Sequence, residues 1–155
     1  MTEDIATAYH ESGHAIAHIH FGCRIKSIEI GDNGAGLTRI LEPLSRPLSS
    51  LQTAICCCAG PASELRFTGS INYHNQETDL RQARALVGEA GLARALQQAG
   101  LLVLQYEGMI ATITWALIVH GRLTEDQLMA ILEGQAGSPR AGAARPRPKS
   151  ITMRF

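Results

Sequence analysis

The sequence feature that most constrains the fold is a pair of histidines four residues apart, His10 and His14, in a run that is nearly free of charge. Apart from these histidines, Glu11 is the only ionisable residue with a charged side chain (Asp, Glu, Lys or Arg) between positions 5 and 17. Residues four apart lie on the same face of an α-helix, about one turn from each other. An unpaired carboxylate in apolar surroundings is costly. The pattern therefore predicts a buried helix in which Glu11 has a partner or a chemical task.

The two histidines and the glutamate form an H-E-x-x-H motif, which is typical of hydrolytic zinc sites. Imidazoles on one helix face can converge on a Zn²⁺ ion at about 2.0–2.1 Å. Glu11 then lies beside the metal, where it can take a proton from a water whose pKa zinc lowers toward about 7. Ser12 and Gly13 are small enough to let another element approach closely. Because glycine in a helix costs about 1 kcal/mol relative to alanine, we expect a packing reason for Gly13.

A catalytic zinc site needs a third protein ligand, and the nearest histidines do not supply it. In a continuous helix, His18 and His20 lie about 12 and 15 Å along the axis from His10, which is too far to share a metal. We interpret both as structural or surface histidines. The remaining candidates come from later in the chain: Glu64, His74, Glu77 and Asp79.

Each of these candidates also has an ordinary structural explanation. Asp79 can be the N-cap of a helix. Glu64 lies in an apolar stretch, where a lone carboxylate is costly unless it is paired. His74 and Glu77 fall in a polar segment without periodicity, which we interpret as a loop with solvated side chains. The spacing of the residues therefore leaves the third ligand open.

The rest of the sequence predicts a mainly α-helical (α+β) domain with one small β-hairpin between the metal-binding helix and a helical bundle. The hairpin is expected over residues 25–41 and a loop over 68–78. Pro61 is expected to kink or restart the helix in which it lies. The segment Thr124–Gln127 matches the pattern of a capping box. The expected helices are 4–20, 49–67, 78–87, 92–96, 101–120 and 124–132.

The charges divide the chain into a body and a tail. Five of the 14 basic residues and none of the 14 acidic residues follow Gly134, so residues 1–134 carry a formal net charge of −5. We predict a folded domain over 1–134 and a basic, disordered tail over 135–155. The net charge of the whole chain is zero, which argues against a basic nucleic-acid-binding protein.

The cysteines and the apolar segments indicate the cellular compartment in which the protein is expected. Three of the four cysteines are consecutive, Cys56–Cys58, which does not suit a secreted disulfide framework. We expect them to pack as small apolar side chains. Residues 1–9 do not resemble a signal peptide, and Glu107 interrupts the most membrane-like stretch, 101–119. The sequence thus predicts a cytoplasmic protein without a membrane span.

Four segments, in the correct order, resemble the peptidase domain of the FtsH-type AAA zinc metalloproteases. Residues 8–15 are similar to the family's A-Y-H-E-A-G-H-A, and 25–30 with 36–38 are similar to a strand and a following G-x-T strand. Residues 59–64 resemble A-G-R-x-A-E, and 78–83 resemble N-D-[LI]-x-x-A. The likeness covers about residues 5–90.

This resemblance implies roles for particular residues. It makes His10, His14 and Asp79 the zinc ligands and Glu11 the general base. It also implies that Glu64 lies close to the metal and orients a histidine from the second coordination shell.

The sequence departs from the family pattern at two places. Pro61 replaces a basic residue, and residues 73–78 lack the Gly-Ala element that precedes the ligand aspartate. The second departure leaves His74 or Glu77 possible as the ligand in place of Asp79.

We therefore expect a zinc-dependent endopeptidase that hydrolyses peptide bonds in unfolded or flexible polypeptides. The alternative is a zinc-bound regulatory or binding module of the same fold without proteolytic function. No P-loop motif occurs in the sequence, so we expect the chain to need a separate unfoldase for folded substrates, or to act as a homo-oligomer.

Overall fold

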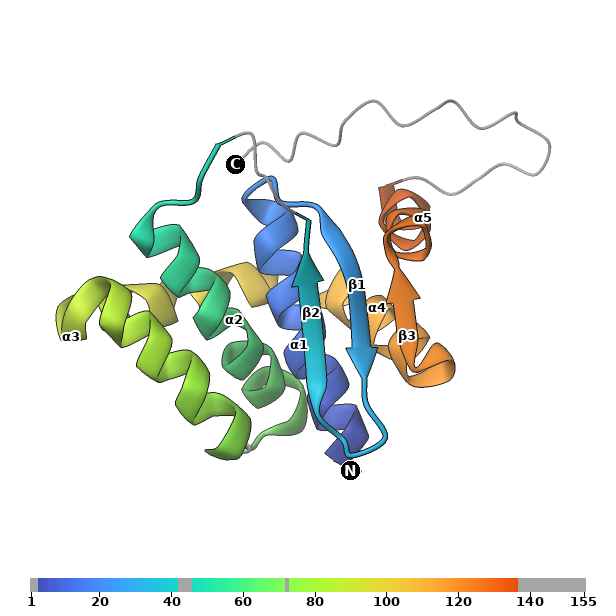
Figure 1. Ribbon diagram of the computed structural model, residues 1–155, viewed down its shortest axis with the longest axis horizontal. Helices are drawn as coiled ribbons and strands as arrows, with labels where there is room; N and C mark the ends of the chain where they lie inside the picture. Colours follow the sequence, from blue (N-terminus) through green and yellow to red (C-terminus); the bar gives the residue numbers. More distant parts are fainter. Residues whose placement is uncertain (1–2, 42–45, 72, 137–155) are drawn as a thin grey trace.

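A computed structural model of the protein describes residues 3–41, 46–71 and 73–136 (Figure 1). The described chain is mainly helical, as predicted, and contains one small antiparallel sheet. Its elements, in chain order, are α1 (Glu3–His20), β1 (Ile25–Ile30), β2 (Gly36–Ile40), α2 (Ser50–Thr68), α3 (Tyr73–Gln105), α4 (Glu107–His120), β3 (Arg122–Thr124) and α5 (Glu125–Ala136).

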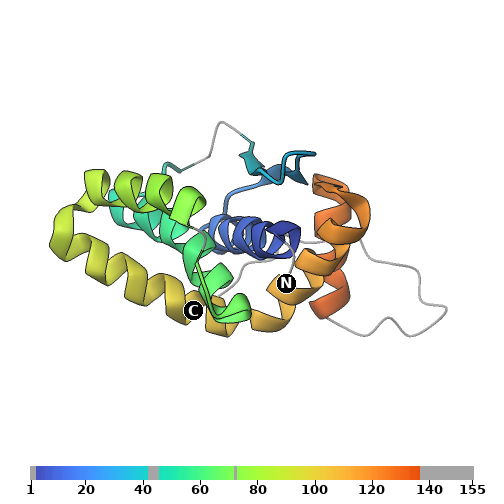
Figure 2. The same cartoon turned by 90° about the horizontal axis from the view of Figure 1, so that it is seen from below.

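Helix α1 is the central element of the fold. The sheet covers one side of it, and α2 and α4 pack against other sides (Figure 2). Its middle is enclosed: Ala8, Ala15 and Ala17 are fully buried, and Ile16 is nearly so. The predicted helix around the histidine pair is confirmed, with its start and end close to the expected positions.

The predicted hairpin is also confirmed, and the structure adds a third strand to it. β1 pairs with β2 on one edge and with β3 on the other, so that Ile28 lies opposite both Thr38 and Leu123. β3 is three residues long, too short to show the alternation of apolar and polar residues by which strands are predicted.

Helix α2 begins where the sequence predicts. Ser49 is its N-cap and forms a reciprocal capping box with Gln52. The expected restart at Pro61 is wrong, because α2 continues through this residue. A proline in a helix removes a backbone hydrogen bond, but Pro61 is almost completely buried here. Packing of α2 against α1 therefore outweighs the local cost.

The segment predicted as a loop over 68–78 is largely helical. α3 begins at Tyr73, so that Asp79 lies inside a helix and is not its N-cap. The first turns of α3 lack an apolar stripe because one face borders the cleft described below and another is exposed. The predicted end of this helix near residue 87 is confirmed. Gly88, at φ 70° and ψ −177°, bends α3 between its two halves.

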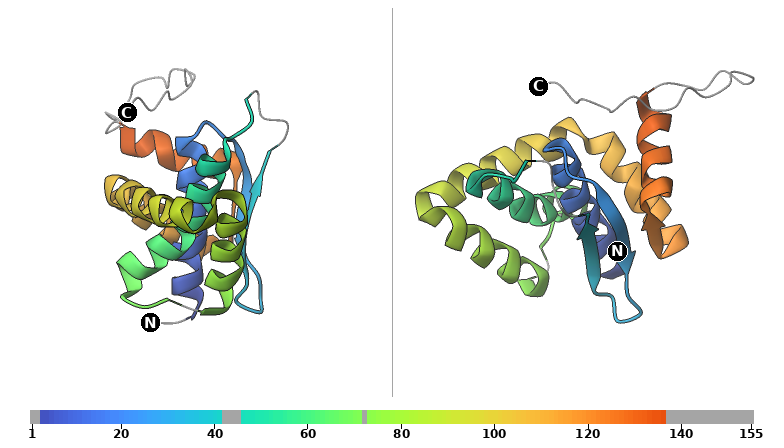
Figure 3. Two further views of the ribbon diagram at one scale, coloured as in Figure 1. Left: turned by 90° about the vertical axis from the view of Figure 1, so that its left-hand side faces the viewer. Right: turned by 45° about the horizontal axis from the view of Figure 1, so that its top comes forward.

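The two halves of α3 lie on either side of α2 (Figure 3). The second half is continuous from Glu89 to Gln105, so the predicted gap after residue 96 is wrong. The predicted helix 101–120 is instead broken at Tyr106. Thr124 and Gln127 form the expected capping box at the start of α5. The predicted tail 135–155 lies almost entirely outside the described residues.

No single helix of the described chain is long and apolar enough to cross a membrane. The segments Gln76–Gln105 and Glu107–His120, which meet at an angle of 79°, reach that length and composition only when taken together.

Candidate metal centre

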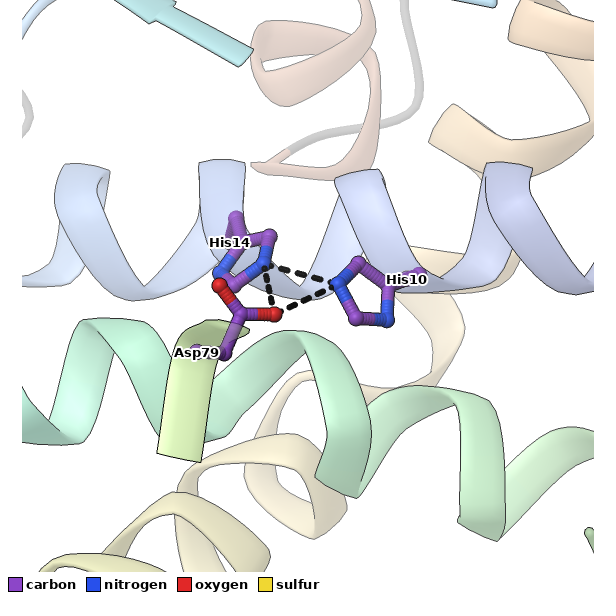
Figure 4. A group of neighbouring side chains, drawn as sticks. All are labelled: His10, His14 and Asp79. Atoms are coloured by element: carbon purple, nitrogen blue, oxygen red, sulfur yellow. Dashed lines mark hydrogen bonds and ion pairs between the residues drawn. The ribbon is translucent and has the colours of Figure 1, made fainter. Parts of the chain in front are cut away.

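Two side chains of α1 and one of α3 converge on a single point (Figure 4). His10 Nε2 lies 3.0 Å from His14 Nε2 and 2.9 Å from Asp79 Oδ2. His14 Nε2 lies 3.3 Å from the same carboxylate oxygen. Among the described residues, this is the one group of three or more His, Cys, Asp or Glu side chains that could hold a metal ion. The structure therefore brings together Asp79 and the two histidines of the sequence motif.

Both histidine rings are held by their other nitrogen. His10 Nδ1 donates a hydrogen bond to Glu64 Oε2 at 3.1 Å, and His14 Nδ1 donates one to the carbonyl oxygen of Cys56 at 2.8 Å. A donor bond at Nδ1 turns the lone pair of Nε2 toward the centre, as is usual for histidines that bind metals. Glu64 is 2% exposed, so its carboxylate lies in the protein interior and has almost no contact with solvent.

The metal-free cluster already favours a positive charge at its centre. Burial lowers the pKa of His10, but hydrogen bonds with Asp79 and Glu64 outweigh burial and raise that pKa to about 9. Burial raises the pKa of Asp79, but hydrogen bonds from His10 and His14 outweigh it and lower that pKa to about 2. The imidazolium of His10 thus sits between two carboxylates.

The donor set and its spacing fit a zinc ion. Two imidazole nitrogens and one carboxylate oxygen are typical ligands of catalytic zinc. Ligands at about 2.0–2.1 Å from Zn²⁺ in a tetrahedron lie about 3.3–3.4 Å from one another. The three donor atoms here, 2.9–3.3 Å apart, are close to that spacing. They leave one coordination position for water or substrate.

Glu11 lies beside the cluster and is not one of its converging groups. It is 7% exposed, and its Oε2 accepts a hydrogen bond of 2.7 Å from the hydroxyl of Thr38 in β2. The backbone of Gly36 lies directly against the same side chain, where a Cβ atom would collide with it. Strand β2 therefore orients the glutamate.

Close approach of α1 and α2 depends on two glycines. A Cβ atom on Gly13 would collide with the backbone of Ala59 in α2, which is the packing reason that the sequence led us to expect. A Cβ atom on Gly60 would collide with the Nε2 atoms of His14 and His10. The histidine rings therefore occupy the space that Gly60 leaves open on α2.

The cluster lies in a cleft of about 580 Å³. Its walls come from α1, β2, α2 and the first half of α3. Cys57 is one of the lining residues, and burial, followed by the charge of Asp79, raises the pKa of its thiol to about 11. The thiol is therefore protonated at neutral pH. Cys56 and Cys58 are buried, as expected of packing residues.

The other residues considered as zinc ligands do not belong to the cluster. His18 lines the cleft but is not part of the cluster, and His20 stacks edge-on against Phe21 and Tyr106. Glu77 is exposed in the first turns of α3. His74 belongs to the same helical segment, and its side chain lies outside the described residues. The expectation that both lie in a loop is wrong.

Sequence reasoning missed three contributions to this site. These are the hydroxyl of Thr38, the carbonyl oxygen of Cys56 and the open space at Gly60. The G-x-T segment at 36–38 was the available signal for Thr38. The other two depend on how α2 crosses α1, for which the sequence has no local signal.

Comparison with known proteins supports a peptidase. No curated protein matches the chain. Residues 1–79 match the model of the Peptidase M50B-like family, a span that covers every residue of the cluster from His10 to Asp79. Since this match includes half of the chain, the protein belongs to the Peptidase M50B-like family of metallopeptidases.

Proposed function

We propose that the protein is a zinc-dependent endopeptidase that hydrolyses peptide bonds in unfolded or flexible polypeptides. The observation that carries the proposal is the convergence of His10 Nε2, His14 Nε2 and Asp79 Oδ2 beside the carboxylate of Glu11. A Zn²⁺ ion held by these three residues would act as a Lewis acid toward the scissile carbonyl and the attacking water.

Glu11 is proposed as the general base. One of its oxygens, Oε2, is engaged by Thr38, and Oε1 accepts no hydrogen bond within the described chain. Oε1 can therefore take a proton from the attacking water and deliver it to the nitrogen of the leaving amine. The hydrogen bond from Thr38 keeps the carboxylate from rotating during this exchange.

The substrate is proposed to bind as a strand along β2. This strand lies at the edge of the sheet, and no described strand pairs with its outer side. Gly36, Leu37, Thr38 and Ile40 border the cleft, and Leu37 is 43% exposed. An extended peptide can pair with such an edge. A folded protein has already used its backbone groups in its own structure, so the site favours unfolded segments.

The finer assignment to an FtsH-type peptidase is also part of this proposal. The resemblance of residues 59–64 and 78–83 to FtsH-type segments agrees with the places of Glu64 and Asp79 at the cluster. We further propose a reducing, cytoplasmic location, with a separate unfoldase or self-association for folded substrates. Protonated, largely buried cysteines are compatible with such a location.

The test is the variant Glu11→Gln, which keeps the shape of the side chain and loses its basicity. We expect it to retain stoichiometric zinc while hydrolysis of a casein-like unfolded chain falls by about 10²-fold or more. Glu89→Gln, an exposed acid on α3, is the matched control and should retain full activity. Wild-type protein should spare a stable folded domain and lose activity with a zinc chelator. Undiminished hydrolysis by Glu11→Gln would contradict the mechanism.

A further inference from the structure

The cleft continues along α1 beyond the metal cluster. His18 lies one helical turn after His14 and lines the cleft, together with Ile40 of β2 and Thr53 of α2. Four residues of helix rise about 6 Å. This is close to the spacing of about 6.6–6.8 Å between side chains on the same face of an extended peptide. A substrate strand in the cleft would therefore place a side chain near His18 about two residues from the scissile bond.

His18 makes no hydrogen bond to any residue of the described chain, although it is only partly exposed. Its Nδ1 atom is enclosed by protein and has no partner there. Burial, followed by the nearby charge of His14, lowers the pKa of His18 to about 4. The ring is thus neutral at physiological pH, and Nε2 is the nitrogen that a bound group can reach. A buried polar atom without a partner, such as this Nδ1, is uncommon.

The charges around the cleft limit what this end can bind. Apart from Glu11 and Asp79, none of the described residues that line the cleft is an aspartate, glutamate, lysine or arginine. Neither an acidic nor a basic substrate side chain would find a counter-ion there, and burying an unpaired charge is costly. Polar but uncharged lining groups, such as Thr53 and His18, suit a neutral hydrogen-bonding side chain.

We propose that His18 forms a specificity subsite for an uncharged hydrogen-bonding side chain of the substrate, such as that of Thr, Ser, Asn or Gln. The proposal rests on the proposed function, since it assumes that the cleft holds a peptide. It assigns His18 a role in substrate selection and none in metal binding.

The test uses a set of uncharged decapeptides in which valine is replaced by the isosteric threonine at one position at a time. Binding is measured with the zinc-loaded Glu11→Gln protein, so that no peptide is consumed. We expect one position at which threonine strengthens binding about 5- to 10-fold, the value of one hydrogen bond. His18→Leu in the same background should reduce that ratio to about 1, and His18→Gln, which keeps a hydrogen-bonding group, should preserve part of it.

His20→Leu is the matched control, because it removes another histidine of α1 that lies outside the cleft. It should leave the threonine preference unchanged. The subsite is refuted if no peptide binds, if no position prefers threonine, or if the preference survives in His18→Leu. Hydrolysis by the wild-type protein is measured separately. Peptides that bind with the expected preference but are not cleaved would refute the peptidase and support the subsite.

Discussion

Glu64 Oε2 lies 3.1 Å from His10 Nδ1, although the two residues are 54 positions apart in the sequence. The contact places a carboxylate behind a proposed metal ligand. Such a carboxylate fixes the orientation of the imidazole and raises its basicity, and its loss typically reduces metal affinity by about 10- to 100-fold.

We therefore expect Glu64→Gln, which can still accept a hydrogen bond, to weaken zinc binding by about 10-fold. Glu64→Ala should weaken it by up to about 100-fold. Affinity is measured by competition with a chelating dye. Glu107→Gln is the control, since Glu107 is partly exposed and pairs with Arg66 away from the cleft. Equal affinity in the wild type and Glu64→Ala would show that this carboxylate does not support the metal.

Asp79→Ala is expected to abolish stoichiometric zinc binding, because it removes the one oxygen ligand of the cluster. His20→Ala should retain the metal, since His20 contacts Tyr106 and not the cluster. Elemental analysis of both purified variants is the measurement. Full zinc content in Asp79→Ala would indicate that another residue is the third zinc ligand. The sequence leaves His74 and Glu77 as the candidates.

Features that depend on neighbours in the sequence could be predicted well. The histidine pair indicates the helix α1, the alternation after Arg24 indicates the hairpin, and the Thr124–Gln127 capping box indicates the start of α5. In each case the physical signal lies within a few residues. Four segments in order also led to Asp79 and Glu64 through a family resemblance, which spacing alone did not do.

Features set by tertiary contact could not be predicted. The helical start of α3 has no apolar stripe, because its Asp79 faces the metal cluster and Glu77 faces solvent. The bond between Thr38 and Glu11 joins residues 27 positions apart. It exists only because β2 crosses α1 at that point. Tertiary packing therefore determines both features, and at the start of α3 it outweighs local propensity.

Thr38→Val tests the role of that bond in orienting the base. The variant keeps the shape and the strand preference of the side chain but cannot donate to Glu11 Oε2. We expect about a 5- to 10-fold loss of kcat/KM, the value of one hydrogen bond, with zinc content unchanged. Thr112→Val changes a partly exposed threonine that bonds within α4, and it should not alter kcat/KM. A wild-type kcat/KM in Thr38→Val would show that Glu11 is oriented by other contacts.

Gly60→Ala is expected to disrupt the metal cluster from the side of α2. The added methyl group would collide with the Nε2 atoms of both proposed histidine ligands, and overpacking of this kind typically costs about 1–3 kcal/mol. Zinc binding should fall with stability. Gly100→Ala is the matched control, because nothing lies within 4 Å of the added atom. It should stabilise the helix by about 0.5–1 kcal/mol. Chemical denaturation and zinc titration of the two variants distinguish these outcomes.

The stability of the metal-free protein should decline as pH rises above neutrality. The pKa of His10 is raised from 6.5 to about 9 in the folded state, so its contribution is complete below pH 6.5 and is lost as pH approaches 9. The pKa of Asp79 is lowered from 3.8 to about 2. Its contribution is present above pH 3.8 and is lost toward pH 2. The contribution of the cluster is therefore greatest between about pH 4 and 6.5.

Zinc should reverse this trend, because it requires the deprotonated imidazole of His10. The rise in Tm on adding zinc is expected to increase from pH 5.5 to 8.5, while the Tm of the chelator-treated protein falls over the same range. His10→Gln is the control: without the titrating ring, its metal-free Tm should fall less over this interval. A metal-free Tm that falls equally in the wild type and His10→Gln would show that the decline has another origin. It would also remove the support for an imidazolium between the carboxylates of Asp79 and Glu64.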